Sequence, residues 1–281
     1  MIFHLTCLDQ QGIIAQFTQL LFQHYVNVFS LEQHVEPEEG LFFMRIHTDL
    51  RNMTISSDAL IDHLNDIANK LSGNLIIHNP LNPLNMAILC TKEQAHVSDL
   101  LMKYKSGELN CKISMVISNH DDLRDLVEQS GTNYHHLPVS VENKKSQEQE
   151  ILSLLEDQNI DVVVLARYMQ VLSPQIVNKF EGRIINIHHA FLPAFKGNRP
   201  YRKAWVRGVK MIGATAHYVT EKLDEGPIIE QDVESVTHQY SVKEMIQAGR
   251  DIERRVLTSA VKAHLQHRIL LHGQRTLIFH S

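Results

Sequence analysis

Residues 161–166 have the sequence D-V-V-V-L-A, in which every residue after Asp161 is apolar. An apolar run of this length is too short for a typical helix, and three consecutive valines favour an extended strand. A strand that is apolar at successive positions, rather than at alternate ones, is typical of a parallel sheet with both faces covered. Residues 161–166 therefore predict a central strand of an α/β fold.

Strand-like and helix-like segments alternate on both sides of this run. The expected strands cover residues 86–90, 113–118, 161–166 and 211–219, and the expected helices cover about 93–105, 121–129, 146–159 and 241–264. The end of the chain has the pattern of a hairpin that turns at Gly273–Gln274. Such alternation predicts a doubly wound, mostly parallel, Rossmann-like sheet.

A proline-rich segment precedes the first of these strands. Residues 79–85 have the sequence N-P-L-N-P-L-N, and two prolines this close together fit neither a helix nor a central strand. A chain of 281 residues is also longer than one average domain. We therefore expect a first domain over residues 1–79, a linker over 80–85 and a second domain over 86–281.

The first domain has the pattern of a compact βαββαβ unit. The expected strands cover residues 2–7, 26–35, 41–48 and 75–77, and the expected helices cover 13–24 and 57–71. This order predicts the split, ferredoxin-like arrangement. Such a unit is more often an interaction or small-ligand module than an enzyme.

Composition excludes several classes of partner. The net charge is −5 and there is no long basic run, which argues against a nucleic-acid partner. No apolar segment approaches the length of a membrane helix, and the N-terminal residues lack the pattern of a signal peptide, so we expect a cytoplasmic protein without a membrane partner. The three cysteines have neither disulfide nor metal-ligand spacing, so we expect buried thiols.

Three polar features of the second domain suggest chemistry. Asn186 and His188 end an apolar run and are two residues apart, so on a strand they lie on one face. Thr215 and His217 have the same spacing on the expected strand 211–219. Asp224 lies in the segment L-D-E-G-P, where glycine and proline predict a tight loop.

An amide, an imidazole and a carboxylate suit acyl chemistry. The amide can donate to an oxygen that gains negative charge, while the imidazole and the carboxylate can exchange protons near neutral pH. The spacing also allows a simpler interpretation, in which Asn186 and His188 are hydrogen-bonded at a strand end and Asp224 only caps a turn. His188 and His189 together could suggest a metal, but adjacent strand residues point to opposite faces, so we expect no metal site.

Longer segments carry a resemblance to a known family. The segments I-I-N-I-H-H-A-F-L-P-A-F-K-G and G-A-T-A-H-Y-V-T-E-K-L-D-E-G-P-I-I resemble the folate-dependent formyltransferase family, and within it the formyltetrahydrofolate deformylases. The segment C-L-D-Q-Q-G-I-I-A near the N-terminus resembles an ACT regulatory domain. Further matching segments lie at residues 100–103, 118–127, 162–174 and 249–257, so the resemblance covers nearly the whole chain.

The resemblance implies hydrolysis of 10-formyltetrahydrofolate to tetrahydrofolate and formate, with formate supplied to purine synthesis. It implies that Asn186 donates to the formyl oxygen, His188 is the acid–base partner, and Asp224 activates water or shuttles the proton. Thr215 and His217 would line the same site and support Asp224. The folate-binding segment would comprise Met169, Gln170, Val171 and Leu172. No cofactor or metal is implied.

The sequence departs from the family pattern at two places. Gln170 stands where an arginine is usual, which puts that folate contact in doubt, and P-Y-R-K-A at 200–204 replaces P-Y-H-Q-A, so no catalytic role is assigned there. A transferase to a phosphorylated amine would need a glycine-rich phosphate cradle after the first strand. Residues 90–96 contain no glycine, and Glu93 would repel a phosphate, so the sequence favours water as the acceptor.

Two alternatives to hydrolysis are folate-dependent transfer of the formyl group to an unknown amine, and a sensor of an amino acid and folate without turnover. In the first domain Asp9 and Gly12 open a helix whose free N–H groups suit a carboxylate, and Asn27 begins the next strand. A plain turn explains the same residues. Glycine and methionine are the expected effectors, on metabolic grounds alone, and we expect a homo-oligomer.

Overall fold

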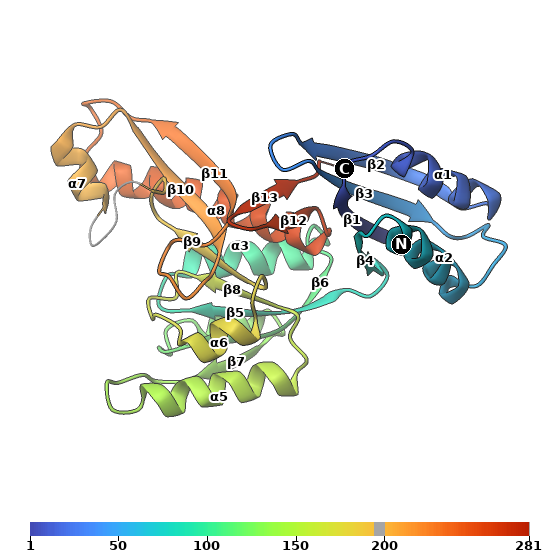
Figure 1. The fold of residues 1–281 in the computed structure, drawn as a ribbon. Helices are drawn as coiled ribbons and strands as arrows, with labels where there is room; N and C mark the ends of the chain where they lie inside the picture. Colours follow the sequence, from blue (N-terminus) through green and yellow to red (C-terminus); the bar gives the residue numbers. More distant parts are fainter. Residues whose placement is uncertain (194–199, 281) are drawn as a thin grey trace. The chain divides into compact units, whose positions relative to one another are not determined.

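The computed structural model describes residues 1–193 and 200–280 and contains two compact units (Figure 1). One unit comprises residues 1–82 together with the C-terminal residues from 278, and the other comprises residues 83–277. In the described part of the chain, no helix is both long enough and apolar enough to cross a membrane.

The first unit is a four-stranded antiparallel sheet with two helices. Its elements are β1 (Ile2–Leu8), α1 (Ile13–Gln23), β2 (Asn27–Glu36), β3 (Leu41–Asp49), α2 (Ser57–Lys70) and β4 (Asn74–His78). The strand order is β2-β3-β1-β4, so the predicted ferredoxin-like βαββαβ order is confirmed. Phe3 and Leu5 of β1 pack with Phe17 of α1 and with Leu60 and Leu64 of α2, and this burial holds both helices on one face of the sheet.

The second unit is built on a seven-stranded sheet. Its elements are β5 (Leu84–Cys90), α3 (Gln94–Lys105), β6 (Cys111–Ser118), α4 (Arg124–Gln129), β7 (Asn133–His136), α5 (Lys144–Asp157), β8 (Val162–Ala166), α6 (Pro174–Lys179), β9 (Ile184–His188), α7 (Pro200–Arg207), β10 (Met211–Tyr218), β11 (Ile228–Ser235) and α8 (Val242–Leu265). A hairpin of β12 (Ile269–His272) and β13 (Arg275–Ile278) follows.

The strand order of the sheet is β11-β10-β9-β8-β5-β6-β7. The five strands from β9 to β7 are parallel, whereas β10 and β11 are antiparallel to their neighbours. The chain starts in the middle at β5, moves outward to β7 and returns to β8, so the winding reverses between β5 and β8. The predicted doubly wound, mostly parallel sheet is confirmed.

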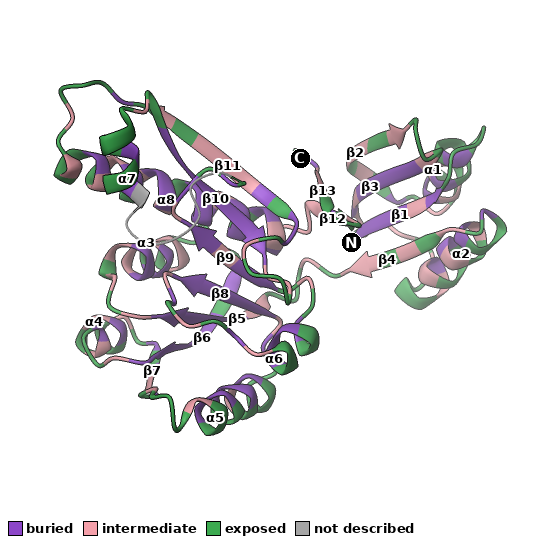
Figure 2. Cartoon of the chain, turned by 60° about the vertical axis from the view of Figure 1, so that its left-hand side comes forward, coloured by how far each residue is buried: buried purple, intermediate pink, exposed green. Residues whose placement is uncertain are grey.

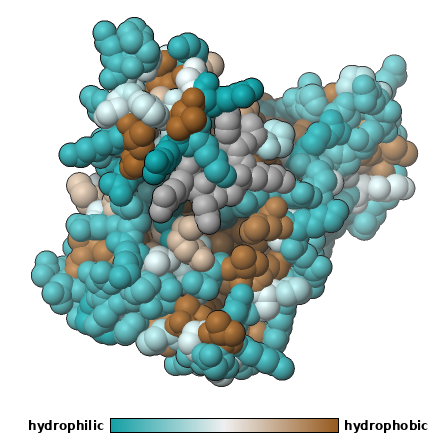
Figure 3. All heavy atoms as spheres, turned by 90° about the vertical axis from the view of Figure 1, so that its left-hand side faces the viewer, coloured by the Kyte–Doolittle hydropathy of each residue, from teal (hydrophilic) through white to brown (hydrophobic). Residues whose placement is uncertain are grey.

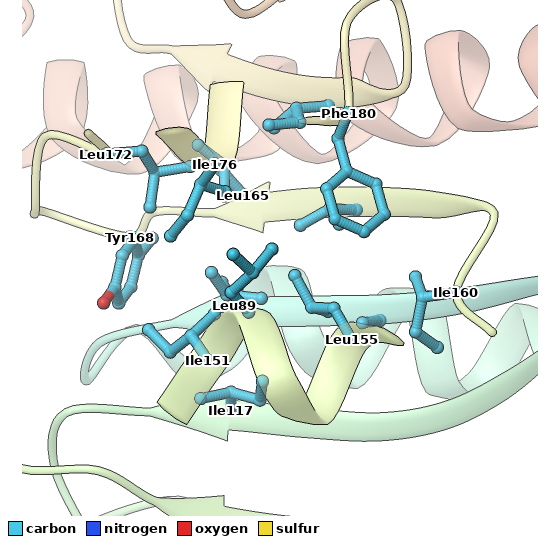
Figure 4. Packing of buried hydrophobic residues seen from close by; sticks show 14 of the residues in the cluster. Leu89, Ile117, Ile151, Leu155, Ile160, Leu165, Tyr168, Leu172, Ile176 and Phe180 are labelled. Atoms are coloured by element: carbon cyan, nitrogen blue, oxygen red, sulfur yellow. The ribbon is translucent and has the colours of Figure 1, made fainter. Parts of the chain in front are cut away.

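Both faces of this sheet are covered, as the apolar run at 161–166 predicts. All five residues of β8 are buried, and the strands around it are buried along most of their length (Figure 2). On one face, Ile151 and Leu155 of α5 and Ile176 of α6 pack against Leu89 and Leu165 (Figure 4). On the other face, α3 and α8 contact each other, and α8 also contacts β9, β10 and β11.

Several elements were not predicted because their sequence signals are weak. Strand β7 has the sequence N-Y-H-H, and β11 is an edge strand rich in acidic residues. Helices α6 and α7 are short. Strand β5 begins at Leu84, inside the segment expected to be a linker, because Leu84 and Asn85 pair with Cys111 and Lys112 of β6.

The packing of α5 against the sheet makes a testable prediction. Leu155 is fully buried in this cluster, so Leu155→Ala should lower the free energy of unfolding by about 2–5 kcal/mol through lost burial and a residual cavity. Urea unfolding followed by circular dichroism measures this change. Leu81→Ala is the control because Leu81 is 85% exposed; equal losses in the two variants would contradict the described core.

Candidate active site

The polar residues singled out from the sequence come from two paired strands. Strand β9 ends at His188, and β10 runs antiparallel beside it, with Asn186 opposite His217 and His188 opposite Thr215. Residues that are directly opposite in a sheet point to the same face. This register therefore brings the Asn186–His188 pair and the Thr215–His217 pair to one place, as the sequence predicts.

Asp224 reaches the same place through a tight loop after β10. A Cβ atom at Gly226 would lie 1.8 Å from the carbonyl oxygen of Tyr218, so only glycine fits this close approach. Tyr218 N also donates to the carbonyl oxygen of Pro227 at 2.9 Å, which closes the loop. Asp224 itself has φ of 56°, a left-handed conformation that Asp adopts more readily than most residues.

The Asp224 carboxylate lies between two imidazoles. Its Oδ1 atom is 3.4 Å from His188 Nδ1 and 3.8 Å from His217 Nε2. The contact with His188 lowers the pKa of Asp224 despite its partial burial. Asp224 is therefore an anion at neutral pH and favours a proton on the Nδ1 atom of His188.

Asn186 has a fixed orientation because of His217. His217 Nδ1 lies 2.8 Å from the carbonyl oxygen of Tyr218, so Nδ1 carries the proton and donates it. Burial lowers the pKa of His217, which keeps the ring neutral and leaves a lone pair on Nε2. Asn186 Nδ2 lies 3.2 Å from that Nε2 atom and donates one of its protons to it. The second amide proton of Asn186 stays available to an oxygen of a bound molecule.

Thr215 has a different role from the one expected. Its hydroxyl donates to the carbonyl oxygen of Ala190 at 2.9 Å and accepts from Leu192 N at 3.0 Å and from Gln231 Nε2 at 2.9 Å. The side chain is fully buried and is not among the residues that line the cavity. Thr215 thus holds the chain that leaves β9, whereas His217 lies beside Asp224.

His189 does not point away from His188. Strand β9 ends at His188, so the alternation of a strand does not apply to the next residue. The two rings stack with centroids 4.9 Å apart and planes 19° apart. Burial, with the nearby charge of Arg167, lowers the pKa of His189 to about 4, so this ring is neutral at pH 7. Across the described residues, no group of three or more His, Cys, Asp or Glu side chains could hold a metal ion.

Five of these residues, Asn186, His188, His189, His217 and Asp224, line a cavity of about 430 Å³. Met169, Gln170, Val171 and Leu172 also line it. Met169 and Val171 are 61% and 56% exposed, whereas Leu172 is also part of the core. In the space-filling view of this side, hydrophobic side chains gather in a recess among hydrophilic ones (Figure 3). Exposed apolar groups beside fixed polar ones are typical of a ligand site.

A second, larger cavity of about 850 Å³ shares residues 219–221 and Asp224 with the first. Of the candidate residues only Asp224 lines it, and its other lining groups include the carboxylates of Glu181, Glu221 and Glu225. The smaller cavity is therefore the better candidate for chemistry, because all the convergent donors and acceptors open onto it.

Sequence reasoning missed Arg167, which also lines the cavity. Arg167 directly follows β8 and has φ of 60°, a strained conformation for arginine. Its place at the carboxyl end of a central parallel strand was the available signal. The end of the segment I-I-N-I-H-H-A-F-L-P-A-F-K-G, residues 194–197, lies outside the described residues.

In the first unit, the residues expected to bind an effector do not form one site. Gly12 has φ of 85° and begins α1, and Asp9 N donates to the carbonyl oxygen of Gly40 at 2.8 Å. Asn27 begins β2 opposite Asp49, at the other end of the sheet. Within one chain, therefore, Asp9 and Gly12 lie together and Asn27 lies apart from them.

The charge of Asp224 predicts a pH-dependent contribution to stability. A carboxyl group whose pKa is lower in the folded state stabilises the fold above its unfolded pKa, and this stabilisation is lost as the pH falls through the folded pKa. Asp224→Asn should therefore be less stable than the parent at pH 7, with the difference shrinking below about pH 4. Urea unfolding across pH 3–7 tests this, with Asp157→Asn on the exposed end of α5 as control. A pH-independent difference would contradict the ion pair.

The chain resembles known proteins over most of its length. Residues 84–261 match the formyl transferase family. The chain is 46% identical over 274 residues to a formyltetrahydrofolate deformylase from Synechocystis sp., covering 98% of this chain and 96% of that one. The crystal structure of a formyltetrahydrofolate deformylase from Pseudomonas syringae is 40% identical and superimposes with a TM-score of 0.96, over 99% of this chain and 94% of the other.

A more distant structure matches in part. It is a glycinamide ribonucleotide transformylase from Symbiobacterium toebii, which is 26% identical, covers 74% of this chain and 98% of its own length, and has a TM-score of 0.68. The deformylases match nearly the full chain, first unit included, whereas the transformylase matches about three quarters of it. The chain therefore belongs to the formyl transferase family, among the formyltetrahydrofolate deformylases.

Proposed function

We propose that this protein hydrolyses 10-formyltetrahydrofolate to tetrahydrofolate and formate at the cavity between residues 165–172 and 219–224. The observation that carries this proposal is the mutual contact of Asn186, His188, His217 and Asp224 in the lining of that cavity. The sequence similarity to deformylases supports the choice of substrate. The formate released is a one-carbon unit suitable for purine synthesis.

The folate ring system fits the apolar wall of the cavity. Met169, Val171 and Leu172 supply apolar surface for the flat pterin, and backbone groups of this segment can bind its polar edge. Gln170 lines the same wall, so an amide takes the place of the arginine usual in the family. In this position the formyl group lies next to Asn186 and His188.

The polar side chains that line the cavity have different roles in the proposed reaction. The free amide proton of Asn186 stabilises the formyl oxygen as it gains negative charge. Asp224 and His188 exchange protons: one accepts a proton from the attacking water, and N10 of the folate receives a proton as the C–N bond breaks. Each step uses side chains alone, and the proposal includes no cofactor.

This mechanism predicts distinct losses on mutation. Asn186→Ala should lower kcat about 10²–10³-fold, because one donor to the developing oxyanion is lost. Asp224→Asn should abolish turnover, because the anion that pairs with His188 disappears. Formate and tetrahydrofolate are measured together after mixing the protein with 10-formyltetrahydrofolate without any amine.

The control for these variants is Gln175→Ala, which removes an exposed amide on α6 and should leave kcat unchanged. Both products should appear in equal amounts with the unmodified protein. Release of tetrahydrofolate without formate would contradict hydrolysis, and full activity of Asp224→Asn would contradict the assigned site.

For the first unit we propose an ACT-like regulatory role, with domain limits near residues 1–79 and 86–281. An amino acid such as glycine or methionine would place its carboxylate near the start of α1, at Asp9 and Gly12. Because Asn27 lies at the other end of the sheet, a site that uses all three residues needs two chains. We therefore propose that the effector binds between two copies of this chain in a homo-oligomer, and that the protein acts in the cytoplasm.

The regulatory proposal makes its own prediction. Glycine or methionine should change the rate of formate release and raise the melting temperature, since a ligand that binds the folded state stabilises it. Asp9→Ala should weaken the response without changing basal activity, because Asp9 lies in the other unit from the catalytic groups. Rates and melting temperatures unchanged by either amino acid would contradict it, as would a monomer in light scattering.

A further inference from the structure

The candidate cavity contains a cation to which the proposed reaction assigns no role. Arg167 is the only lysine or arginine among the described residues that line this cavity, and its side chain is 24% exposed. The same lining includes two acidic side chains, Glu221 and Asp224. A small anion inside the cavity therefore has one positive side chain to bind and two acidic ones to avoid.

The guanidinium of Arg167 is only partly used by the protein itself. Its Nη1 atom lies 3.5 Å from Oε2 of Glu253, and neither of these two atoms has a hydrogen-bond partner. No hydrogen bond joins the other N–H groups of Arg167 to a described residue. A guanidinium has five N–H donors in a planar fork that matches a carboxylate. Donors for an anion therefore remain on Arg167 beside its contact with Glu253.

The backbone at Arg167 is also typical of a ligand-binding residue. Arg167 directly follows β8 and has φ of 60°, a strained conformation that is found most often at functional sites. The winding of the sheet reverses between β5 and β8, and open α/β sheets bind ligands at the carboxyl ends of such strands. Arg167 thus lies where this kind of sheet presents side chains to a ligand.

His189 offers a second donor beside the reacting groups. Its ring stacks on His188, with centroids 4.9 Å apart, and it lines the same cavity as Arg167. Burial and the charge of Arg167 lower the pKa of His189 to about 4, so the ring is neutral and has one N–H donor. No hydrogen bond joins this ring to a described residue. The N–H of His189 is therefore also available to a bound molecule.

The chemistry of hydrolysis produces an anion next to these donors. The oxygen of water bonds to the formyl carbon, the C–N10 bond breaks and N10 gains one proton. The other proton of the water is released, so the second product is the formate anion. It forms beside Asp224, which is itself an anion, and like charges a few ångströms apart repel each other.

We propose that Arg167 and His189 form a subsite for the formate product, in which the Arg167 guanidinium and the His189 N–H bind the carboxylate and draw it away from Asp224. This inference rests on the proposed hydrolase function. The subsite is separate from Asn186, His188 and Asp224, which act on the formyl group before the C–N bond breaks. It takes a small carboxylate, and its role is to hold and release the product.

Formate binding to the folate-free protein tests the subsite. In isothermal titration calorimetry with sodium formate, against sodium chloride at the same ionic strength, the parent should bind with a Kd on the order of 1 mM. Arg167→Gln should bind at least about tenfold more weakly, because a charge-assisted hydrogen bond is lost. Arg207→Gln is the matched control, because Arg207 is exposed and does not line the cavity. No binding by the parent, or equal affinities of the parent and Arg167→Gln, would overturn the proposal.

A second variant keeps the test decisive if Arg167→Gln, which leaves Glu253 without its guanidinium, does not fold. His189→Phe keeps an aromatic ring that can stack on His188 but removes the N–H donor. This variant should bind formate about threefold to tenfold more weakly, because one hydrogen bond to a charged group is lost. Circular dichroism reports whether the variant is folded. An affinity equal to that of the parent in folded His189→Phe would contradict the subsite.

Turnover measurements place the bound formate inside the cavity. Added formate should inhibit tetrahydrofolate release by the parent, and the inhibition constant should be about tenfold higher in Arg167→Gln. Formate that binds without inhibiting would contradict a subsite in this cavity. Calorimetry does not require turnover, so a parent that binds formate through Arg167 without hydrolysing 10-formyltetrahydrofolate would refute the proposed function alone.

Discussion

The antiparallel register of β9 and β10 is the constraint on which the site depends. In this register Asn186 lies opposite His217, and His188 lies opposite Thr215. An amide and two imidazoles therefore lie on one face of the sheet. The loop that follows brings a carboxylate against them, and Gly226 permits it because no side chain fits so near the carbonyl oxygen of Tyr218. A register shift of one residue would turn these side chains to the other face.

Charge at the site is concentrated on few atoms. His217 and His189 are neutral near pH 7, for which burial is the main cause, and the lone pair of His217 sets the orientation of Asn186. The Asp224 anion is then left to act mainly on His188. Arg167, the cation that lines the same cavity, lies against Glu253. The arrangement therefore has separate groups for oxyanion stabilisation and for proton transfer.

The sequence predicted those parts of the fold in which local pattern and tertiary structure agree. The apolar run at 161–166 predicted a covered central strand, and the spacing of Asn186, His188 and His217 predicted their common face. Prediction failed where long-range contacts decide. His189 stacks on His188 only because the strand ends there. Thr215 forms hydrogen bonds with Ala190 and Leu192 because the chain after β9 folds back over it. The Glu253 carboxylate contacts His96, Arg167 and Tyr201, of which His96 is 157 positions away in the sequence, and no local signal contains that proximity.

The backbone at Arg167 has a consequence for how this protein can change. Glycine would adopt the left-handed conformation at that position with little strain, but Arg167→Gly would also leave the buried Glu253 carboxylate without the guanidinium beside it, and this loss exceeds the strain relieved. The strained backbone and the buried ion pair are therefore retained together, and laboratory evolution toward heat resistance would keep the arginine in spite of its conformation.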